Sequence, residues 1–489
     1  MRSVTAPVGG WNTRDALDSM PPTDAIVLDN WFPETGKISV RKGTSQHATG
    51  VGNGDVQTLV EYHAGTTRQL IAAGGGGLYN ATSAGAATSI QTGYTSNKWQ
   101  AVNFNGQLHL VNGEDAPQMY NGAISTPSWS GSGLTNADLV GVEVFKNRLF
   151  FWEKDSQDFW YAAINAVTGT LTKFPLSRVS NLGGNIVCMG TWTMDAGQGV
   201  DDRLVILLSS GQAIVYEGTD PGDSSAFGIV GIYNIGPPVD RRAIAKVAGD
   251  LFVATKDGYV SFAEVWRKGR LRTQESKITG AAVEAAGLYS GNFGWQVLHY
   301  PKGTRVLVNV PKNSNEYVQH VLNTVTGAWC RFTDMNARCW GLYNDNLYFG
   351  HTNGVVFKAD TGAADASANI TAEAQTAWNA FRTPVPKRFS QARTLVSGSG
   401  ALSLTQGIAY DFGEVLVEQS TSTESPGVSW DDVYWDDEFW SPEATTRDGW
   451  LSVTGEGHAA SLRLRYAGQV ENLVWYRTDY VYETGFGLT

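Results

Sequence analysis

One phrase recurs seven times along this chain and restricts its fold more than any other feature of the sequence. In each copy an apolar strand leads through a turn into a second strand, most often one that bears Tyr or Phe. Two short strands joined by a tight turn form a β-hairpin. The seven copies begin at Leu70, Leu108, Leu149, Leu204, Leu251, Val306 and Leu347.

The spacing of the copies predicts a propeller. Successive copies begin about 40 to 55 residues apart, which is the length of a propeller blade of four short strands. A further strand precedes several copies, as at residues 100–104 and 142–145. A β-sandwich has no reason to repeat one phrase at this period. We therefore expect an all-β chain with a β-propeller of six or seven blades over residues 45–365.

The segments on either side of the propeller predict two smaller parts. Residues 361–367 are rich in Thr, Gly and Ala and read as a linker. Beyond them, residues 366–489 contain stretches of alternating apolar and polar residues, which predicts a C-terminal β-sandwich-like domain. Residues 1–44 predict an extended N-terminal arm with a short helix and a hairpin. Thr23 or Asp24 would cap that helix, which carries Ile26 and Leu28.

Several phrases of this sequence resemble a known family. They are GGWNTRD at 9–15, MPPTDA at 20–25, LDNWFP at 28–33, NTVTGAW at 323–329 and WYRTDY at 475–480. Together they resemble the tail nozzle proteins of short-tailed bacteriophages, also called tail hub or packaged-DNA-stabilising proteins. The resemblance implies a structural virion protein that is made in the host cytoplasm and resides in the virion tail.

The same resemblance implies a set of partners. The chain would form a homo-oligomer, a hexameric ring, below the portal and its adaptor proteins. The ring would be the lower tail channel, which retains and conducts packaged DNA, and it would meet tail fibre and needle or plug proteins. Double-stranded DNA would pass through the lumen without tight binding.

The net charge of the chain is consistent with a channel through which DNA slides without tight binding. The formal net charge is -11, whereas proteins that grip nucleic acid neutralise phosphates with an excess of Lys and Arg. An acidic lumen would repel the DNA backbone.

The sequence lacks the usual signals of an enzyme. It has no nucleophile elbow and no His-Glu-x-x-His pair, and residues 324–329 resemble a sialidase box without its Asp. Cys188, Cys330 and Cys339 form no CxxC pair and are expected to be small buried side chains. We expect no cofactor, no metal and no catalysis. Two alternatives remain open: a propeller glycosidase or depolymerase, and a sugar-binding receptor module of a virion.

Two groups of residues are candidates for subunit or partner contacts. The aromatic group comprises Trp11 and Trp31 in the arm and the Asp-flanked Trp430, Trp435 and Trp440. The basic group comprises Arg267, Lys268, Arg270 and Arg272, whose turn chemistry predicts a solvated hairpin tip. No stretch of 18 apolar residues occurs, so we expect no membrane segment.

The arm admits two interpretations. Residues 1–43 could brace a joint between subunits or against the adaptor ring. Alternatively, the strand at residues 38–40 could close the last propeller blade.

Overall fold

The computed structural model describes residues 1–193, 202–268, 276–399, 402–415, 417–423, 444–447 and 449–485. The chain divides into two compact units, each built from separate stretches. The propeller unit comprises Gln46–Val318 and Asn336–Lys358, and the sandwich unit comprises Met1–Ser45, Gln319–Met335 and Ala359–Thr489. The stretches of the two units alternate along the chain, whereas the sequence predicts three consecutive parts.

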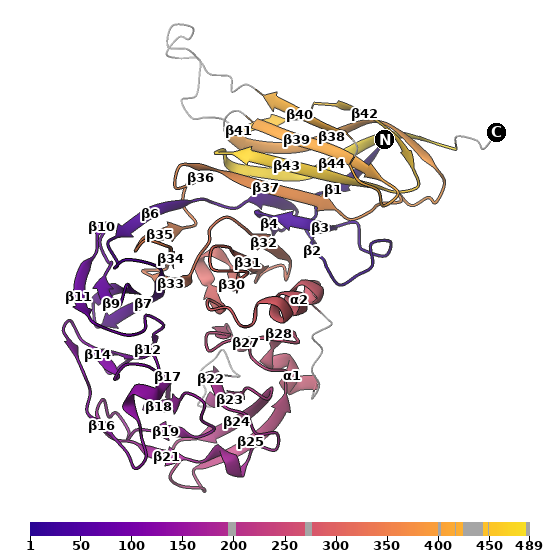
Figure 1. Ribbon diagram of the computed structural model, residues 1–489. Helices are drawn as coiled ribbons and strands as arrows, with labels where there is room; N and C mark the ends of the chain where they lie inside the picture. Colours follow the sequence, from indigo (N-terminus) through magenta and orange to yellow (C-terminus); the bar gives the residue numbers. More distant parts are fainter. Residues whose placement is uncertain are drawn as a thin grey trace. The chain divides into compact units, whose positions relative to one another are not determined.

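The described strands form seven blade-like sheets (Figure 1). The first blade contains β7 (Val56–Ala64), β8 (Thr67–Gly74), β9 (Gly77–Asn80) and β11 (Thr88–Thr92), and the second contains β12 (Gln100–Phe104), β13 (Gln107–Val111), β14 (Gln118–Tyr120) and β15 (Ile124–Ser125). The third contains β17 (Leu139–Phe145), β18 (Arg148–Glu153), β19 (Phe159–Tyr161) and β21 (Thr172–Phe174). The fourth contains β22 (Ile186–Thr193), β23 (Asp202–Leu208), β24 (Gln212–Gly218) and β25 (Phe227–Asn234).

The other three blades depart from this plan at their outer edges. The fifth has β26 (Ile244–Val247), β27 (Asp250–Thr255) and β28 (Gly258–Ser261), followed by α1 (Phe262–Lys268) and α2 (Thr279–Tyr289). The sixth has β29 (Gln296–Tyr300), β30 (Arg305–Pro311), β31 (Tyr317–Asn323) and β32 (Trp329–Phe332), of which β32 and most of β31 fall in the stretch counted with the sandwich unit. The seventh has β33 (Cys339–Tyr343), β34 (Asn346–Gly350), β35 (Val356–Ala359) and, as its outer strand, β6 (Thr44–Thr49).

The inner strands of these sheets close a ring. Each contacts the inner strand of the next blade, in the order β7, β12, β17, β22, β26, β29 and β33, and β33 contacts β7. The described residues therefore form a closed propeller of seven blades, which confirms the predicted fold.

The recurring phrase is the middle hairpin of every blade. All seven copies coincide with paired strands, from β8 and β9 in the first blade to β34 and β35 in the last. The seven leading residues are buried, with at most 3% of any side chain exposed. Apolar side chains of neighbouring blades pack against one another, as Leu78 does against Trp99 and Leu108 in one cluster. The period of the phrase thus reflects one packed sheet per repeat.

The strand that closes the last blade is not the one that the sequence analysis considered. Residues 38–40 lie in β5 (Lys37–Val40), which pairs with β4 (Trp31–Glu34) and β44 (Glu471–Thr484) in the sandwich unit. The seventh blade is completed by β6 instead. Its Ala48 is fully buried and clusters with Tyr348 and Val356.

The sandwich unit consists of two sheets. One has the order β4, β5, β44, β38 (Lys387–Ser399) and β41 (Ala444–Arg447), with β1 (Arg2–Thr5) on β44 and β42 (Leu451–Gly457) on β38. The other contains β32, β3 (Asp24–Asp29), β37 (Ala368–Thr376), β43 (Ala460–Gly468), β39 (Leu402–Tyr410) and β40 (Glu418–Thr423), with β2 (Gly10–Trp11) on β3.

These two sheets share a core. Thr394 of β38 donates a buried hydrogen bond of 2.8 Å to Gln406 of β39. The rings of Phe389 and Tyr410, from the same two strands, lie 5.3 Å apart. Facing sheets with interdigitated side chains are the sandwich that the sequence predicts.

The remaining described elements are short. They are β10 (Gly85–Ala86), β16 (Trp129–Ser130), β20 (Gly169–Thr170) and β36 (Ala364–Asp365), with 3-10 turns at Asn136–Asp138, Leu176–Arg178 and Pro301–Gly303.

The predicted helix of the N-terminal arm is wrong. Residues 24–29 form strand β3, which pairs with β2, β32 and β37. Asp24 does not cap a helix, because its buried carboxylate accepts a hydrogen bond of 2.8 Å from Asn12 Nδ2. Strand pairing on both sides thus outweighs the local capping signal. The arm is extended, as predicted, and its strands belong to the sheets of the sandwich unit.

The prediction of a hairpin tip at the basic stretch is also wrong for Arg267 and Lys268, because both residues belong to helix α1. Helix α1 places Phe262, Val265 and Trp266 at i, i+3 and i+4, and all three pack into one core cluster with Trp192. That spacing presents one face of a helix to the blade. Residues 269–275, which include Arg270 and Arg272, lie outside the described part of the chain.

Candidate functional site

The propeller unit contains a cavity of about 230 Å³ at its axis. Its walls come from the inner strands of blades around the ring, and its polar lining includes Gln100, Glu143, Arg241, Arg242 and Gln296. We call it the axial cavity. Ligands commonly bind in concave sites where a few polar groups converge.

Arg242 ties several blades together at this cavity. It lies in the connection from β25 to β26, and its guanidinium donates to Gln57 O at 2.8 Å, Thr58 Oγ1 at 2.7 Å and Trp99 O at 2.7 Å. These acceptors lie in the first blade and at the entry to the second. The N–H of Val297 in the sixth blade donates to Arg242 O at 2.8 Å. The Arg242 side chain therefore reaches across the propeller axis.

Arg241 is less fully engaged. Its guanidinium donates one long hydrogen bond, of 3.4 Å, to Asn112 O. Its own backbone N–H donates to Asp240 Oδ1 at 2.7 Å. Burial lowers the pKa of both Arg241 and Arg242. Among the described residues, no carboxylate lies within 4.0 Å of either guanidinium.

Glu143 is the acidic residue of the cavity. It is half-buried in β17, an otherwise uncharged strand, and accepts a hydrogen bond of 3.3 Å from Thr191 Oγ1. Burial raises the pKa of its carboxyl to about 7, although Lys246 and Thr191 act in the opposite direction. A carboxyl group whose pKa lies near 7 can gain or lose its proton at neutral pH.

We expect Arg242→Ala to destabilise the propeller by about 3 kcal/mol, because three charge-assisted hydrogen bonds are lost and their acceptors are left buried. Arg242→Lys should recover only part of this loss, since an ammonium group cannot bond in several directions as a guanidinium fork does. Hydrogen exchange in β7 and β12 measures the effect, with the exposed Arg388→Ala as control. Unchanged protection in Arg242→Ala would refute this role.

A second prediction concerns pH. The folded-state pKa of Glu143 lies above its ordinary value of 4.5, so the folded protein binds this proton more tightly than the unfolded chain does. The stability of the wild type relative to Glu143→Gln should therefore fall as pH rises from about 4.5 to 7, by on the order of 2 kcal/mol, and level off above pH 7. Thermal melting across this range, with the exposed Glu471→Gln as control, tests the sign. A stability of the wild type, relative to Glu143→Gln, that rises between pH 4.5 and 7 would contradict it.

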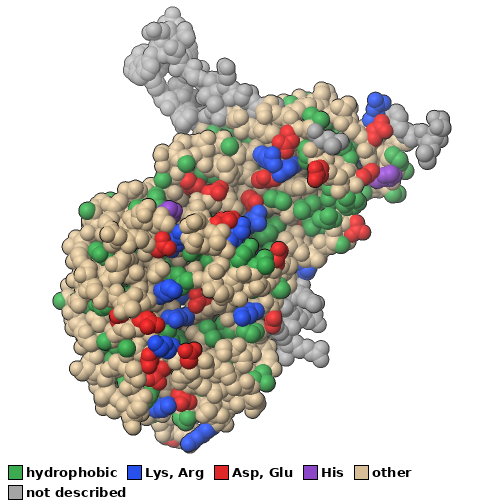
Figure 2. All heavy atoms as spheres, in the orientation of Figure 1, with side chains coloured by type: hydrophobic (Ala, Val, Ile, Leu, Met, Phe, Trp, Pro, Cys, Tyr) green, Lys and Arg blue, Asp and Glu red, His purple; other side chains and the backbone are tan. Residues whose placement is uncertain are grey.

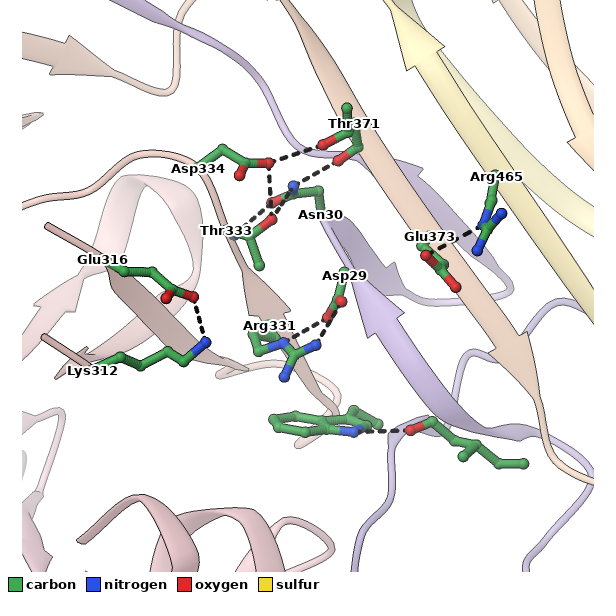
Figure 3. A network of polar contacts seen from close by, with 12 residues as sticks. Asp29, Asn30, Lys312, Glu316, Arg331, Thr333, Asp334, Thr371, Glu373 and Arg465 are labelled. Atoms are coloured by element: carbon green, nitrogen blue, oxygen red, sulfur yellow. Dashed lines mark hydrogen bonds and ion pairs between the residues drawn. The ribbon is translucent and has the colours of Figure 1, made fainter. Parts of the chain in front are cut away.

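The sandwich unit holds a second polar group, on the sheet that contains β3 and β37 (Figure 3). Arg331 donates two hydrogen bonds to Asp29, of 2.7 and 2.6 Å, and Glu373 pairs with Arg465 at 3.4 Å. Asp29 and Glu373 face each other in register, and a cavity of about 370 Å³ lies beside them. Each carboxylate already has an arginine partner, so this group is internally neutralised.

Asn30 organises the chain beside that group. It has a left-handed φ of 59° and is fully buried. Its amide donates to Thr333 Oγ1 at 2.8 Å and to Thr371 O at 2.7 Å, and its oxygen accepts from Arg41 Nε at 2.7 Å. Asn tolerates this backbone conformation, and its side chain is fully used.

The aromatic contact residues of the arm are not exposed. Trp31 is fully buried and packs edge-on against Trp475 at 6.1 Å. Trp11 is buried as well, donates to Ile26 O at 3.1 Å and packs against His320 at 5.3 Å. Packing within the sandwich unit covers both indoles in the single chain, and their contact with a partner stays a prediction. Trp430, Trp435 and Trp440 lie outside the described residues.

Of the basic group, Arg267 is exposed on helix α1, where its Nε donates to Ala263 O at 3.3 Å. Lys268 ends that helix, and its side chain is not among those described. Figure 2 shows acidic and basic side chains interspersed over the visible face of the propeller unit, without a broad patch of one sign.

The described parts of the chain contain no group of three or more His, Cys, Asp or Glu side chains placed to hold a metal ion. Within the same residues, no helix combines the length and apolarity needed to cross a bilayer. Cys188, Cys330 and Cys339 are buried free thiols, as predicted, and burial raises the pKa of Cys339 to about 12.

The residues of the axial cavity escaped the sequence analysis. Two features of the sequence pointed to these residues. Glu143 is the one charged residue in the strand at 139–145, and Arg241 and Arg242 form an adjacent pair in a connection between repeats. In a propeller the inner strands line the axis, so charges on these strands and on the connections that lead into them lie near it.

Comparisons with known proteins add little. No protein-family model and no curated protein matches the chain. Similar solved structures include BBS1N in complex with ARL6DN (10% identity, 67% of this chain and 100% of that chain, TM-score 0.40) and Sqt1 of Saccharomyces cerevisiae (11%, 68% and 96%, TM-score 0.39). Another is BamB from Moraxella catarrhalis (11%, 67% and 92%, TM-score 0.34). TM-scores this low carry no argument about function.

Proposed function

We propose that this chain is a structural virion protein, a tail nozzle subunit of a short-tailed bacteriophage, which forms a channel that retains and conducts packaged DNA. The observation that carries the proposal is where the phrases of the family resemblance lie. The N-terminal phrases, residues 323–329 and residues 475–480 are far apart in sequence, yet all belong to the sandwich unit.

These phrases touch one another within that unit. Asn323 Nδ2 donates to Pro33 O at 2.8 Å, and Trp31 packs against Trp475. A side chain on Gly10, which has a φ of 87°, would lie 2.6 Å from Trp329 O, so only glycine fits there. The resemblance therefore maps onto one folded unit with its internal contacts. This supports a shared structural role more than scattered short matches would.

The path of the DNA follows from the propeller axis. A cavity of about 230 Å³ crossed by Arg242 cannot admit a duplex. A DNA channel must therefore lie between several copies of the chain, as in a closed ring of identical subunits. With a net charge of -11 per copy, such an assembly would repel the phosphate backbone.

The alternative of a propeller glycosidase has weaker support. Retaining and inverting glycosidases use two carboxyl groups on either side of one bond. Among the described residues that line the axial cavity, Glu143 is the one acid. Asp29 and Glu373 do form a pair in the sandwich unit, but arginines engage both.

We expect the purified chain to bind double-stranded DNA with a dissociation constant weaker than about 1 μM at physiological salt, since its net charge of -11 repels the phosphate backbone. Fluorescence anisotropy with a duplex, repeated across a salt series, measures this. Sub-micromolar affinity with a steep salt dependence would contradict a sliding channel. Arg267→Ala would then show whether helix α1 belongs to the gripping surface.

A further inference from the structure

The axial cavity holds two arginines, and although Asp240 acts on both electrostatically, no described carboxylate lies within 4.0 Å of either guanidinium. Arg241 and Arg242 are adjacent in sequence, both line the cavity, and both are half-buried. The acceptors of Arg242 are neutral, namely two backbone carbonyls and one hydroxyl. Buried charges in proteins are generally paired.

The pair has unused hydrogen-bonding capacity on the Arg241 side. A guanidinium carries five N–H donors, and Arg241 makes one long hydrogen bond to a carbonyl. Gln100 lines the same cavity, and no side-chain hydrogen bond of its amide occurs among the described residues. Gln296 is different, because its amide is committed to the backbone of Trp340 in both directions. Arg241 and Gln100 are therefore the donors left for a ligand.

The size of the cavity limits that ligand. One water molecule occupies about 30 Å³ in the liquid, so a space of about 230 Å³ admits a small ion with some water but not a polymer. Oxyanions suit a guanidinium because two parallel N–H groups match two oxygens.

We propose that the axial cavity binds a small oxyanion, of the sulfate or phosphate type, through Arg241, with Gln100 as a second donor and Arg242 supplying positive charge. This site is separate from the proposed nozzle function and does not depend on it. Its effect would be to stabilise the propeller, since a ligand that binds only the folded state raises its stability.

The site should depend on pH through Glu143. The charged or titratable groups around this carboxyl are Lys246, the Cys188 thiol, Arg241, Arg242 and Asp240. When Glu143 is ionised it repels an anion in the same cavity, and when protonated it does not. Binding should therefore be tighter below pH 7 than above it.

The test is titration calorimetry of the full chain with sulfate, whose charge is constant over this range, against chloride at equal ionic strength. We expect saturable binding of one sulfate at pH 6, about tenfold weaker in Arg241→Gln. Arg388→Gln, which removes an exposed arginine of the sandwich unit, should leave it unchanged. Glu143→Gln should bind at pH 8 as tightly as the wild type does at pH 6.

Three outcomes would overturn the proposal. They are no saturable sulfate binding at pH 6, equal binding by Arg241→Gln and the wild type, and equal binding of chloride. Circular dichroism of each variant shows whether it is folded. If Arg241→Gln does not fold, the Glu143→Gln variant tests the proposal by itself. The proposal requires Glu143→Gln to bind sulfate more tightly than the wild type at pH 8.

Discussion

Removal of residues 1–49 should destabilise the propeller by roughly 3 to 5 kcal/mol, whereas removal of residues 1–43 should not. The two truncations differ by β6, the outer strand of the seventh blade. Without β6, the outer edge of β35 loses its partner at about 1 kcal/mol for each ladder hydrogen bond. Ala48, which is fully buried, also leaves the cluster around Tyr348 and Val356.

Hydrogen exchange read on peptides from β34 and β35 measures this effect directly. Protection should be lost in the longer truncation and kept in the shorter one. Peptides from β23 and β24, in the fourth blade, serve as an internal comparison because β6 is not part of their sheet. Equal protection of the seventh blade in both truncations would show that β6 does not close the propeller.

Removal of residues 1–43 should instead unfold the sandwich unit. This segment supplies β1 to β5, including the fully buried Leu28, Trp31 and Ile38. The loss of even one large core side chain costs about 3 to 5 kcal/mol, and here several are lost together with four strand pairings to the rest of the unit. Peptides from β43 and β44 should exchange rapidly in this variant, while those from the first four blades, whose strands all lie in the propeller unit, stay protected.

A matched control is truncation of residues 1–5. It removes only β1, an edge strand whose side chains are half-buried or exposed and which pairs with β44 alone. We expect a small effect on β43 and β44 from this shorter deletion. Full protection of these strands after removal of 1–43 would mean that the arm is an accessory and not a part of the sandwich.

The propeller was predictable because its signal is local and repeated. Each blade places a hairpin of apolar residues at its centre, so the same pattern appears seven times and the errors of single matches average out. The C-terminal strands were predictable for a related reason. Alternation such as that of Leu462 and Leu464, both buried in β43, reports one face of a sheet.

The errors fall where tertiary contacts outweigh local signals. Asp24 stands where a helix cap would stand, but β2 and β37 pair with the segment and make it a strand. Trp266 precedes a run of basic and glycine residues that suggested a turn, yet it packs with Phe262 on one side of a helix. In both cases the deciding partners lie elsewhere in the sequence.

The axial cavity could not be predicted for the same reason. Arg242 meets Thr58 and Trp99, which are separated from it by more than one blade of sequence. No periodicity reports a contact across the axis of a ring, because each blade contributes a different residue there. Only the unusual placement of charge, such as Glu143 within an apolar strand, pointed to the site.

We propose that copies of this chain assemble around a shared DNA channel. Electron microscopy of the purified protein, alone and with the portal and adaptor proteins of a short-tailed phage, tests it most directly. We expect closed rings of six copies around an open lumen wide enough for a DNA duplex. Isolated single subunits under both conditions, with the propeller axis as their only opening, would contradict it.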